Sequence, residues 1–162
     1  MYWEPRIKTY GFNEVTDLSL LEFLLRPGWI GEMDFGFQEL KVPGEGFFLV
    51  FAQIRDREKL SLYVLVKYQW EAYIRTQFLQ ILGRDPGESV RVTSPVGLIY
   101  FHGPHFGDRY GIAHAAFGAL AKESIPVLAA GCSVSSVYIV LSEEGLAKGR
   151  KLLAEAFELP QF

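Results

Sequence analysis

The chain has little of the chemistry that marks disulfide-bonded, thiolate-metal or membrane proteins. Its 162 residues include one cysteine, Cys132, which excludes an internal disulfide and leaves no thiolate cluster for zinc. No apolar run approaches the roughly 18 residues that a membrane-spanning helix needs, and the opening MYWEPRIK lacks the regions of a signal peptide. We therefore expect a cytoplasmic protein that does not bind membranes and whose stability comes from its core.

Basic residues are not in excess either. Lysine and arginine number 16 against 19 acidic residues, so the net charge is −3 and the pI is about 5.6. Binding to nucleic acid requires a surplus of cations that neutralise phosphates. Nucleic acid is therefore not an expected partner.

Catalytic motifs are also missing. The sequence contains neither a P-loop nor a G-x-S-x-G nucleophile motif, so we expect no enzyme activity and no cofactor. His102, His105 and His114, together with Asp108, are residue types that bind zinc or iron, but their spacing matches no metal motif. A metal-dependent enzyme built on this histidine cluster is kept as an alternative.

Apolar residues, by contrast, are abundant. They make up 49% of the chain, enough for one core or two small ones. The clearest interruption is GRDPGES, residues 83–89, where turn-forming and charged residues separate two apolar regions. It predicts two units, residues 1–85 and 86–162.

The first unit contains one clear helix and one clear hairpin. Apolar residues at helical spacing predict a helix over 68–82, and two β-rich runs, 47–55 and 60–66, predict an antiparallel pair around a charged turn. For residues 16–28 we favour a helix capped by Thr16, with a buried strand over 18–25 as the alternative, because short apolar runs do not decide between the two.

The remainder of the first forty residues is assigned to strands. The segments 6–12 and 31–42 are predicted as strands on either side of the helix, and residues 43–46 as the turn before the hairpin. The first unit then has several strands and ends in a helix.

The second unit has a plainer order. A strand over 89–101 leads through a glycine-rich loop into a helix over 111–124, and strands over 125–130 and 134–141 precede a helix over 142–157. This β-α-β-β-α order predicts an α+β fold of the ferredoxin-like type, βαββαβ, with helices on one face of an antiparallel sheet.

The loop and its helix carry a family resemblance. Residues 96–159 resemble an ACT domain, and more narrowly the last ACT domain in the regulatory region of aspartokinases, whose loop commonly reads Asp-Arg-Pro-Gly-Ile/Val-Ala. Tyr110 stands where that family has proline, and Val134 where aspartokinases often have glutamate. The resemblance implies two ACT-like units, the first degenerate, that bind an amino acid in a regulatory protein. The matching residues are Asp108, Arg109, Gly111, Ile112, Ala113, Phe117, Leu120, Ile125, Val127, Ala154, Phe157 and Leu159.

The chemistry of the loop suits a carboxylate. A helix that begins near Gly111 has N–H groups without intrahelical partners, and glycines let a ligand approach the backbone closely. Asp108 would take an ammonium group, although glycine-rich loops also connect strands to helices without any ligand. The candidate ligand-binding residues are Gly103, His105, Phe106, Gly107, Asp108, Arg109, Tyr110, Gly111, Ile112, Ala113, Leu128, Ala130, Gly131, Cys132 and Ser133.

These observations lead to one expected function and one further alternative. We expect a stand-alone sensor that binds an amino acid, forms a homodimer through its sheet edges and acts on a biosynthetic enzyme. Tyr110 and Val134 favour the alternative of a ligand-free interaction or regulatory subunit of a separately encoded aspartokinase-like enzyme. Cys132, in the predicted hairpin turn, is expected to be a packing thiol rather than a reactive one.

Overall fold

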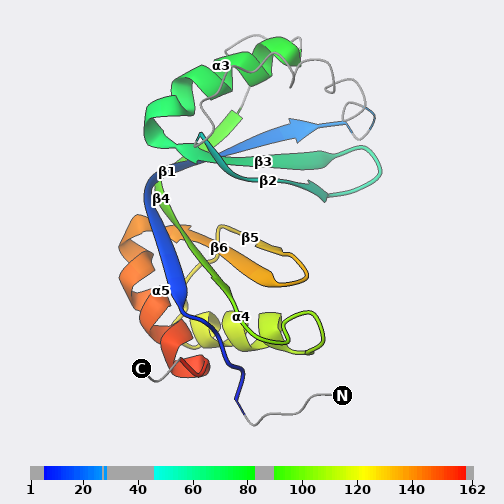
Figure 1. The fold of residues 1–162 in the computed structure, drawn as a ribbon. Coiled ribbons are helices and arrows are strands. Elements are labelled where there is room, and N and C mark those ends of the chain that lie inside the picture. Colours follow the sequence, from blue (N-terminus) through cyan, green and yellow to red (C-terminus); the bar gives the residue numbers. More distant parts are fainter. Residues whose placement is uncertain (1–5, 27, 29–45, 83–89, 160–162) are drawn as a thin grey trace. The chain divides into compact units, whose positions relative to one another are not determined.

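The computed structural model describes residues 6–26, 28, 46–82 and 90–159. The strands follow one another in the hydrogen-bonded order β2-β3-β1-β4-β6-β5, which confirms an α+β fold. In the described part of the chain no helix is both long and apolar enough to cross a membrane. The elements are β1 (Phe12–Leu25), β2 (Phe47–Ile54), β3 (Leu60–Lys67), the short 3-10 helix η1 (Tyr68–Trp70), α3 (Glu71–Ile81), β4 (Val90–His102), α4 (Ile112–Lys122), β5 (Ala129–Cys132), β6 (Ser136–Ser142) and α5 (Glu143–Ala156) (Figure 1).

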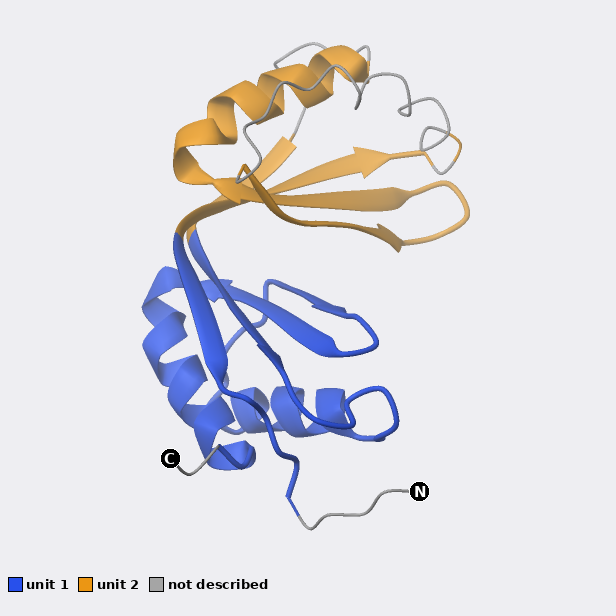
Figure 2. Ribbon diagram, in the orientation of Figure 1, with its two compact units in different colours: residues 1–16, 96–162 blue, residues 17–95 orange. Residues whose placement is uncertain are grey.

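Two compact units share these elements. Unit 1 comprises residues 1–16 and 96–162, and unit 2 comprises residues 17–95 (Figure 2). This differs from the expected division into 1–85 and 86–162, because β1 and β4 each begin in one unit and end in the other. The turn-rich segment 83–89, on which that division was based, lies outside the described residues.

β1 corrects the prediction for the N-terminal region. The favoured helix over 16–28 is wrong, and the buried-strand alternative is confirmed: β1 pairs antiparallel with β3 from Leu18↔Lys67 to Leu25↔Leu60. Leucine favours helices in isolation, but burial against neighbouring strands overrides that propensity. The strand predicted over 6–12 is reduced to a bridge between Lys8 and Glu158 before β1 begins at Phe12. The strand predicted over 31–42 lies outside the described residues.

Unit 2 confirms the predicted hairpin and helix. β2 and β3 pair antiparallel, and α3 follows η1 within the predicted range. Ile74 and Phe78 of α3 pack into a cluster with residues of β1 and β3, in which the rings of Phe23 and Phe78 stack with their centroids 4.9 Å apart. The helix is therefore held to the sheet by aromatic and aliphatic burial.

A polar network in unit 2 is centred on Glu22 of β1. Its carboxylate accepts hydrogen bonds from Ser61 Oγ at 2.9 Å and from the Tyr63 hydroxyl at 3.1 Å, and the guanidinium of Arg55 also donates to it. The Glu22 side chain is only 15% exposed. The network therefore compensates a charge that is largely removed from water.

Unit 1 supplies a complete ferredoxin-like set of elements. β4, α4, β5, β6 and α5 occur in the predicted order, and the first part of β1 lies beside β4 as the final strand. Phe12 of β1 joins the core, where its ring lies 4.9 Å from that of Phe101 and 6.0 Å from that of Phe157. The N-terminal strand is therefore part of this core.

The β5–β6 hairpin is shorter than expected. β5 begins at Ala129 rather than at Ile125, because Pro126 has no N–H to donate to a strand ladder. Cys132 is the last residue of β5, outside the turn, and it is exposed, so the expected burial of this thiol is wrong. Partial burial nevertheless raises the pKa of this thiol. A reactive thiolate is therefore disfavoured.

Candidate functional site

The β4–α4 loop and the β5–β6 turn meet at one end of the unit 1 sheet. His102 at the end of β4 pairs with Ser136, and the next residue of β6, Val137, pairs with Cys132 at the end of β5. A Cβ atom on Gly107 would lie 3.1 Å from Val134 Cγ1, so the loop and the turn are in contact. This end of the sheet is where the predicted loop site lies.

The first half of the loop is packed into the unit. Phe106 is 7% exposed and its ring meets that of Phe101 edge to face, with centroids 6.0 Å apart. His105 has a positive φ of 61°, and its carbonyl accepts a hydrogen bond from the N–H of Asp108 at 3.0 Å. A ligand therefore has no access between this half of the loop and the core.

Residues 6–11, which we call the N-terminal segment, hold the loop from the other side. The Tyr10 N–H and the Thr9 hydroxyl both donate to the carbonyl of His102, at 2.9 and 2.8 Å. Arg109 Nη1 donates to the carbonyl of Arg6 at 3.3 Å. The start and the end of the loop are thus both tied to the N-terminal segment.

The same segment is tied to the residues that follow α5. The Thr9 N–H donates to the carbonyl of Glu158 at 3.0 Å, and the Glu158 N–H donates to the carbonyl of Ile7 at 2.9 Å. Arg6 Nη2 donates to the carbonyl of Glu155 at 2.9 Å. The N-terminal segment therefore connects the loop mechanically to the C-terminal end of α5.

The second half of the loop remains open. Gly111, the residue before α4, has a φ of 88° and makes no side-chain cap, and the first helical hydrogen bond runs from the Ala115 N–H to the Gly111 carbonyl at 2.9 Å. The N–H groups of the first turn have no intrahelical partners, so they favour an anion. Asp108 is exposed beside this helix start, and Tyr110 is 89% exposed.

Comparisons with known proteins agree with this architecture. No family model matches the sequence, and no curated protein is significantly similar to it. Among solved structures, the regulatory subunit of aspartate kinase from Thermus flavus superposes with a TM-score of 0.78 at 14% identity, over 93% of this chain and 99% of that one. The ligand-free regulatory subunit from Thermus thermophilus gives 0.76 at 12% identity, over 93% and 99%.

The chain has the fold of an aspartate kinase regulatory subunit. The aspartate kinase of Clostridium acetobutylicum also matches, with a TM-score of 0.73 at 17% identity, over 97% of this chain and 37% of the enzyme. The resemblance of residues 96–159 to aspartokinase regulatory domains is therefore confirmed at the level of the fold, and it extends to the N-terminal half.

Within this aspartate kinase regulatory fold, the predicted ligand-binding residues separate into groups. Exposed side chains beside the helix start come from Asp108 and Tyr110, whereas Phe106 and Ile112 belong to the core cluster. Leu128 lies farther along the sheet from the loop than the other members: its N–H donates to the carbonyl of Val140, whereas the loop end of β6 is Ser136, which pairs with His102. The remaining members are Gly103, His105, Gly107, Arg109, Gly111 and Ala113 in the loop and helix start, and Ala130, Gly131, Cys132 and Ser133 on the hairpin.

The histidines do not form a metal centre in the part of the chain that the structure describes. No group of three or more His, Cys, Asp or Glu side chains lies close enough there to hold a metal ion. His102 instead packs against Tyr10, with ring centroids 5.3 Å apart, and His114 is exposed on α4. The alternative of a metal-dependent enzyme therefore has no support in these residues.

Sequence reasoning missed a concave region in unit 1 that lies away from the loop. It is a groove between the start of β1 and α5, lined from the helix by Ala147, Arg150, Lys151 and Ala154. The spacing i, i+3, i+4, i+7 puts these residues on one helical face, which is a signal that the sequence contains. This spacing alone did not predict a groove, because the sequence did not show that β1 lies opposite that face of the helix.

Proposed function

We propose that this chain is a regulatory, non-catalytic protein that binds an amino acid at the β4–α4 loop and transmits binding to a partner enzyme. The open start of α4 at Gly111 carries the proposal. A ligand carboxylate would accept hydrogen bonds from the first-turn N–H groups, and Asp108 would take the ligand ammonium. The likeness of the fold to regulatory subunits of aspartate kinase supports the regulatory role.

Transmission would use the N-terminal segment. Arg109 lies between the helix start and the carbonyl of Arg6, and Arg6 in turn bonds the carbonyl of Glu155 on α5. A ligand that orders residues 107–111 favours one arrangement of these contacts and so shifts the surface that a partner meets. The free edge of β5 is the expected place for edge-to-edge pairing in a homodimer.

The binding proposal is tested by thermal unfolding of the full chain with each of the twenty amino acids. A ligand that binds only the folded state raises the unfolding midpoint. Asp108→Asn should weaken the effect at least tenfold in ligand concentration, whereas Asp17→Asn, which removes the same charge from another exposed aspartate, should leave it unchanged. The proposal is wrong if no amino acid raises the midpoint, or if the two variants behave alike.

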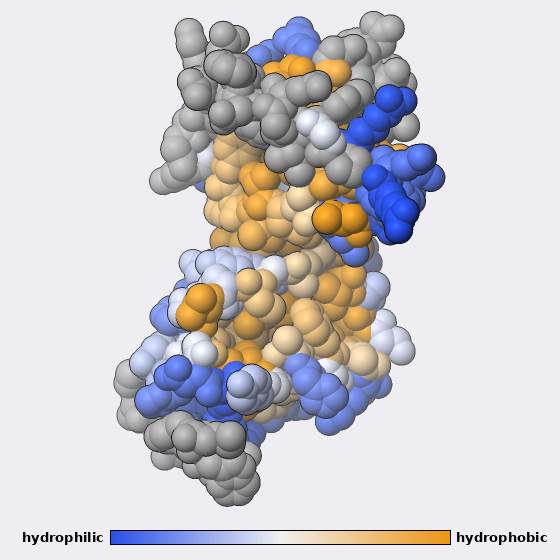
Figure 3. Space-filling model, turned by 90° about the vertical axis from the view of Figure 1, so that its right-hand side faces the viewer, coloured by the Kyte–Doolittle hydropathy of each residue, from blue (hydrophilic) through white to orange (hydrophobic). Residues whose placement is uncertain are grey.

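A second candidate is a ligand-free interaction subunit of a separately encoded enzyme. It is favoured by two large apolar side chains exposed at the loop end of unit 1, Tyr110 at 89% and Val134 at 82%. Figure 3 views the molecule from this side, where hydrophobic side chains reach the surface among hydrophilic ones. The amino-acid screen separates the candidates, because an interaction subunit without a ligand would show no rise of the unfolding midpoint with any of the twenty amino acids.

A further inference from the structure

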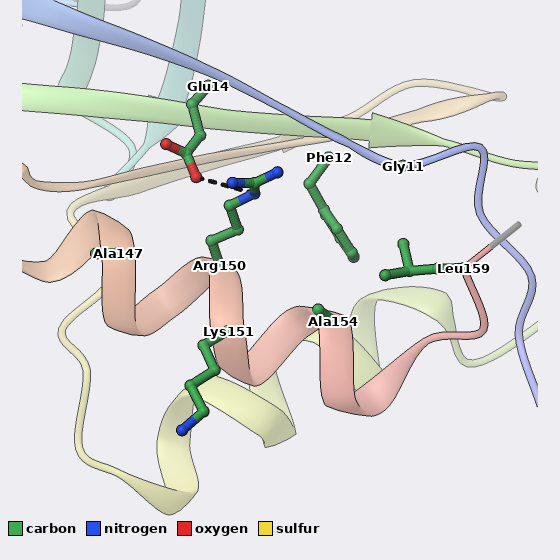
Figure 4. Close-up of a pocket in the computed structure, with 8 residues that line it drawn as sticks. All are labelled: Gly11, Phe12, Glu14, Ala147, Arg150, Lys151, Ala154 and Leu159. Atoms are coloured by element: carbon green, nitrogen blue, oxygen red, sulfur yellow. Dashed lines mark ion pairs between the residues drawn. The ribbon is translucent and has the colours of Figure 1, made fainter. Parts of the chain in front are cut away.

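The groove beside α5 has the size and the form of a small-molecule site. Its volume is about 510 Å³, within the range of 300–1,000 Å³ that is typical of ligand pockets. Gly11 of the N-terminal segment and Phe12 and Glu14 of β1 line it opposite α5, and Leu159 closes one end (Figure 4). Ala147 and Ala154 on α5 lack the bulk that would fill the space, so the hollow remains between helix and strand.

Charges of both signs lie at the rim of the groove. Arg150 Nε lies 3.2 Å from Glu14 Oε1, and the two side chains are 57% and 30% exposed. An exposed ion pair of this kind contributes about 1 kcal/mol or less, so a ligand can compete for either partner. A guanidinium carries five N–H donors, and the contact with Glu14 through Nε leaves others for a second anion.

The floor of the groove is apolar. Figure 4 shows the Phe12 ring and the Leu159 side chain pointing toward one another to the right of the Glu14–Arg150 pair, whereas the Lys151 side chain points away from that pair. An apolar body on this floor would lie directly beside one anionic and one cationic group. That combination matches a molecule with an ammonium, a carboxylate and an apolar side chain.

We propose that the groove binds an apolar α-amino acid, with its carboxylate on Arg150, its ammonium on Glu14 and its side chain on Phe12, Ala154 and Leu159. This would be a second site, because the groove shares no residue with the loop of residues 103–111. The groove and the loop are connected along the chain: Gly11 and Phe12 directly follow Tyr10, whose N–H donates to the carbonyl of His102. The two sites are therefore positioned to influence each other.

The test is a titration of the ¹⁵N-labelled full chain with L-leucine, followed by amide chemical shifts. Saturable shifts at Gly11, Ala147 and Ala154 are expected if the groove binds. Shifts confined to residues 107–113 would overturn the groove proposal and support the loop site. Shifts confined to the groove would support the groove proposal and speak against the loop as the site for leucine. The absence of saturable shifts at the groove also overturns it.

Matched variants identify the groups responsible. Arg150→Gln should raise the dissociation constant for leucine at least tenfold, whereas Lys122→Gln, which removes the same charge from an exposed position at the end of α4 outside the groove, should change it less than twofold. Ala147→Leu fills the groove from an exposed helix position and should also abolish the shifts, with the spectrum itself reporting that the fold is intact. If the two charge variants had equal effects, the binding would be explained by general electrostatic attraction, and the proposal would be wrong.

Two analogues test the two ends of the ligand. Leucinamide lacks the carboxylate and should not shift the groove amides, whereas 4-methylpentanoate lacks the ammonium and should bind more weakly than leucine. Glu14→Gln should weaken leucine but not 4-methylpentanoate, because only leucine uses Glu14. A similar loss for both compounds in Glu14→Gln contradicts the assigned role of this carboxylate.

Discussion

The backbone oxygen of Lys8 occupies the space that a side chain on Gly103 would need. The Cα atom of Thr9 lies 3.0 Å from the same position. Gly103 is thus required by the close approach of the N-terminal segment, and not by a ligand or by a positive φ. This contact fixes the start of the β4–α4 loop against the N-terminal segment. A ligand of the loop would therefore bind at residues 107–111.

Replacement of Gly103 should therefore destabilise unit 1. Gly103→Ala forces backbone atoms apart, and overpacking of this kind costs about 1–3 kcal/mol of unfolding free energy. Gly118→Ala is the control: a Cβ there meets nothing within 4 Å, and alanine in place of glycine inside a helix gains roughly 0.5–1 kcal/mol. Urea unfolding of both variants measures the two effects, and a neutral Gly103→Ala would contradict the described contact.

Gly111 has a different requirement. Its φ of 88° is left-handed and no atom lies within 4 Å of its Cβ position, so backbone strain alone opposes a side chain there. Gly111→Ala should cost about 1–2 kcal/mol, and Gly111→Asn less, because asparagine tolerates this conformation better. Thermal unfolding distinguishes the two substitutions. Equal costs for alanine and asparagine would indicate a steric clash instead.

An element of the fold could be predicted from the sequence when the contacts that determine its secondary structure lie close together in the chain. The helix of residues 71–81 and the hairpin of residues 47–67 were predictable, because their apolar spacing and turn residues lie within one short window. The run Leu18–Leu25 was not, because its choice between helix and strand is made by β3, some forty residues away. Its leucines fit both structures until that partner is known.

The candidate site shows the same limit. The open helix start at Gly111 was predictable from the loop sequence and its family resemblance. The N-terminal segment on Gly103 was not, since it joins residues far apart in the chain, and the groove beside α5 also depends on β1 lying opposite the helix. Leu128 was included because the whole segment 128–132 was expected to form the wall opposite the loop. Only the register of β5 against β6 shows how far each of these residues lies from the loop.

Glu22 predicts a pH dependence of stability. Burial raises the pKa of its carboxyl, but the hydrogen bonds from Ser61, Tyr63 and Arg55, with the charge of Arg55, outweigh it, so the pKa lies below its ordinary value. A carboxyl with a lowered pKa in the folded state stabilises the fold above its unfolded-state pKa, about 4.3. This stabilisation is lost as the pH falls through the lower, folded-state value.

Glu22→Gln should accordingly reduce the free energy of unfolding at pH 7 by about 1–3 kcal/mol, since it leaves partners of a partly buried charge unsatisfied. The deficit relative to wild type should shrink below about pH 4.3, as the wild-type carboxylate is itself protonated. Glu58→Gln, at the exposed hairpin turn, makes the same charge change and should have little effect. A deficit that stays constant from pH 7 to pH 3 would contradict the role assigned to the charged form.

The division into units predicts which fragment of the chain folds alone. Residues 86–162 lack the first part of β1, so the ring contacts of Phe12 with Phe101 and Phe157 are lost and one edge of β4 is uncovered. We expect this fragment not to unfold cooperatively. A permuted fragment, residues 90–159 followed by a short glycine linker and residues 6–16, should do so, because Glu158 already pairs with Ile7 and Thr9 and the linker has little distance to span. Circular dichroism melting compares the two, and cooperative unfolding of 86–162 alone would show that the first part of β1 is dispensable to the core of unit 1.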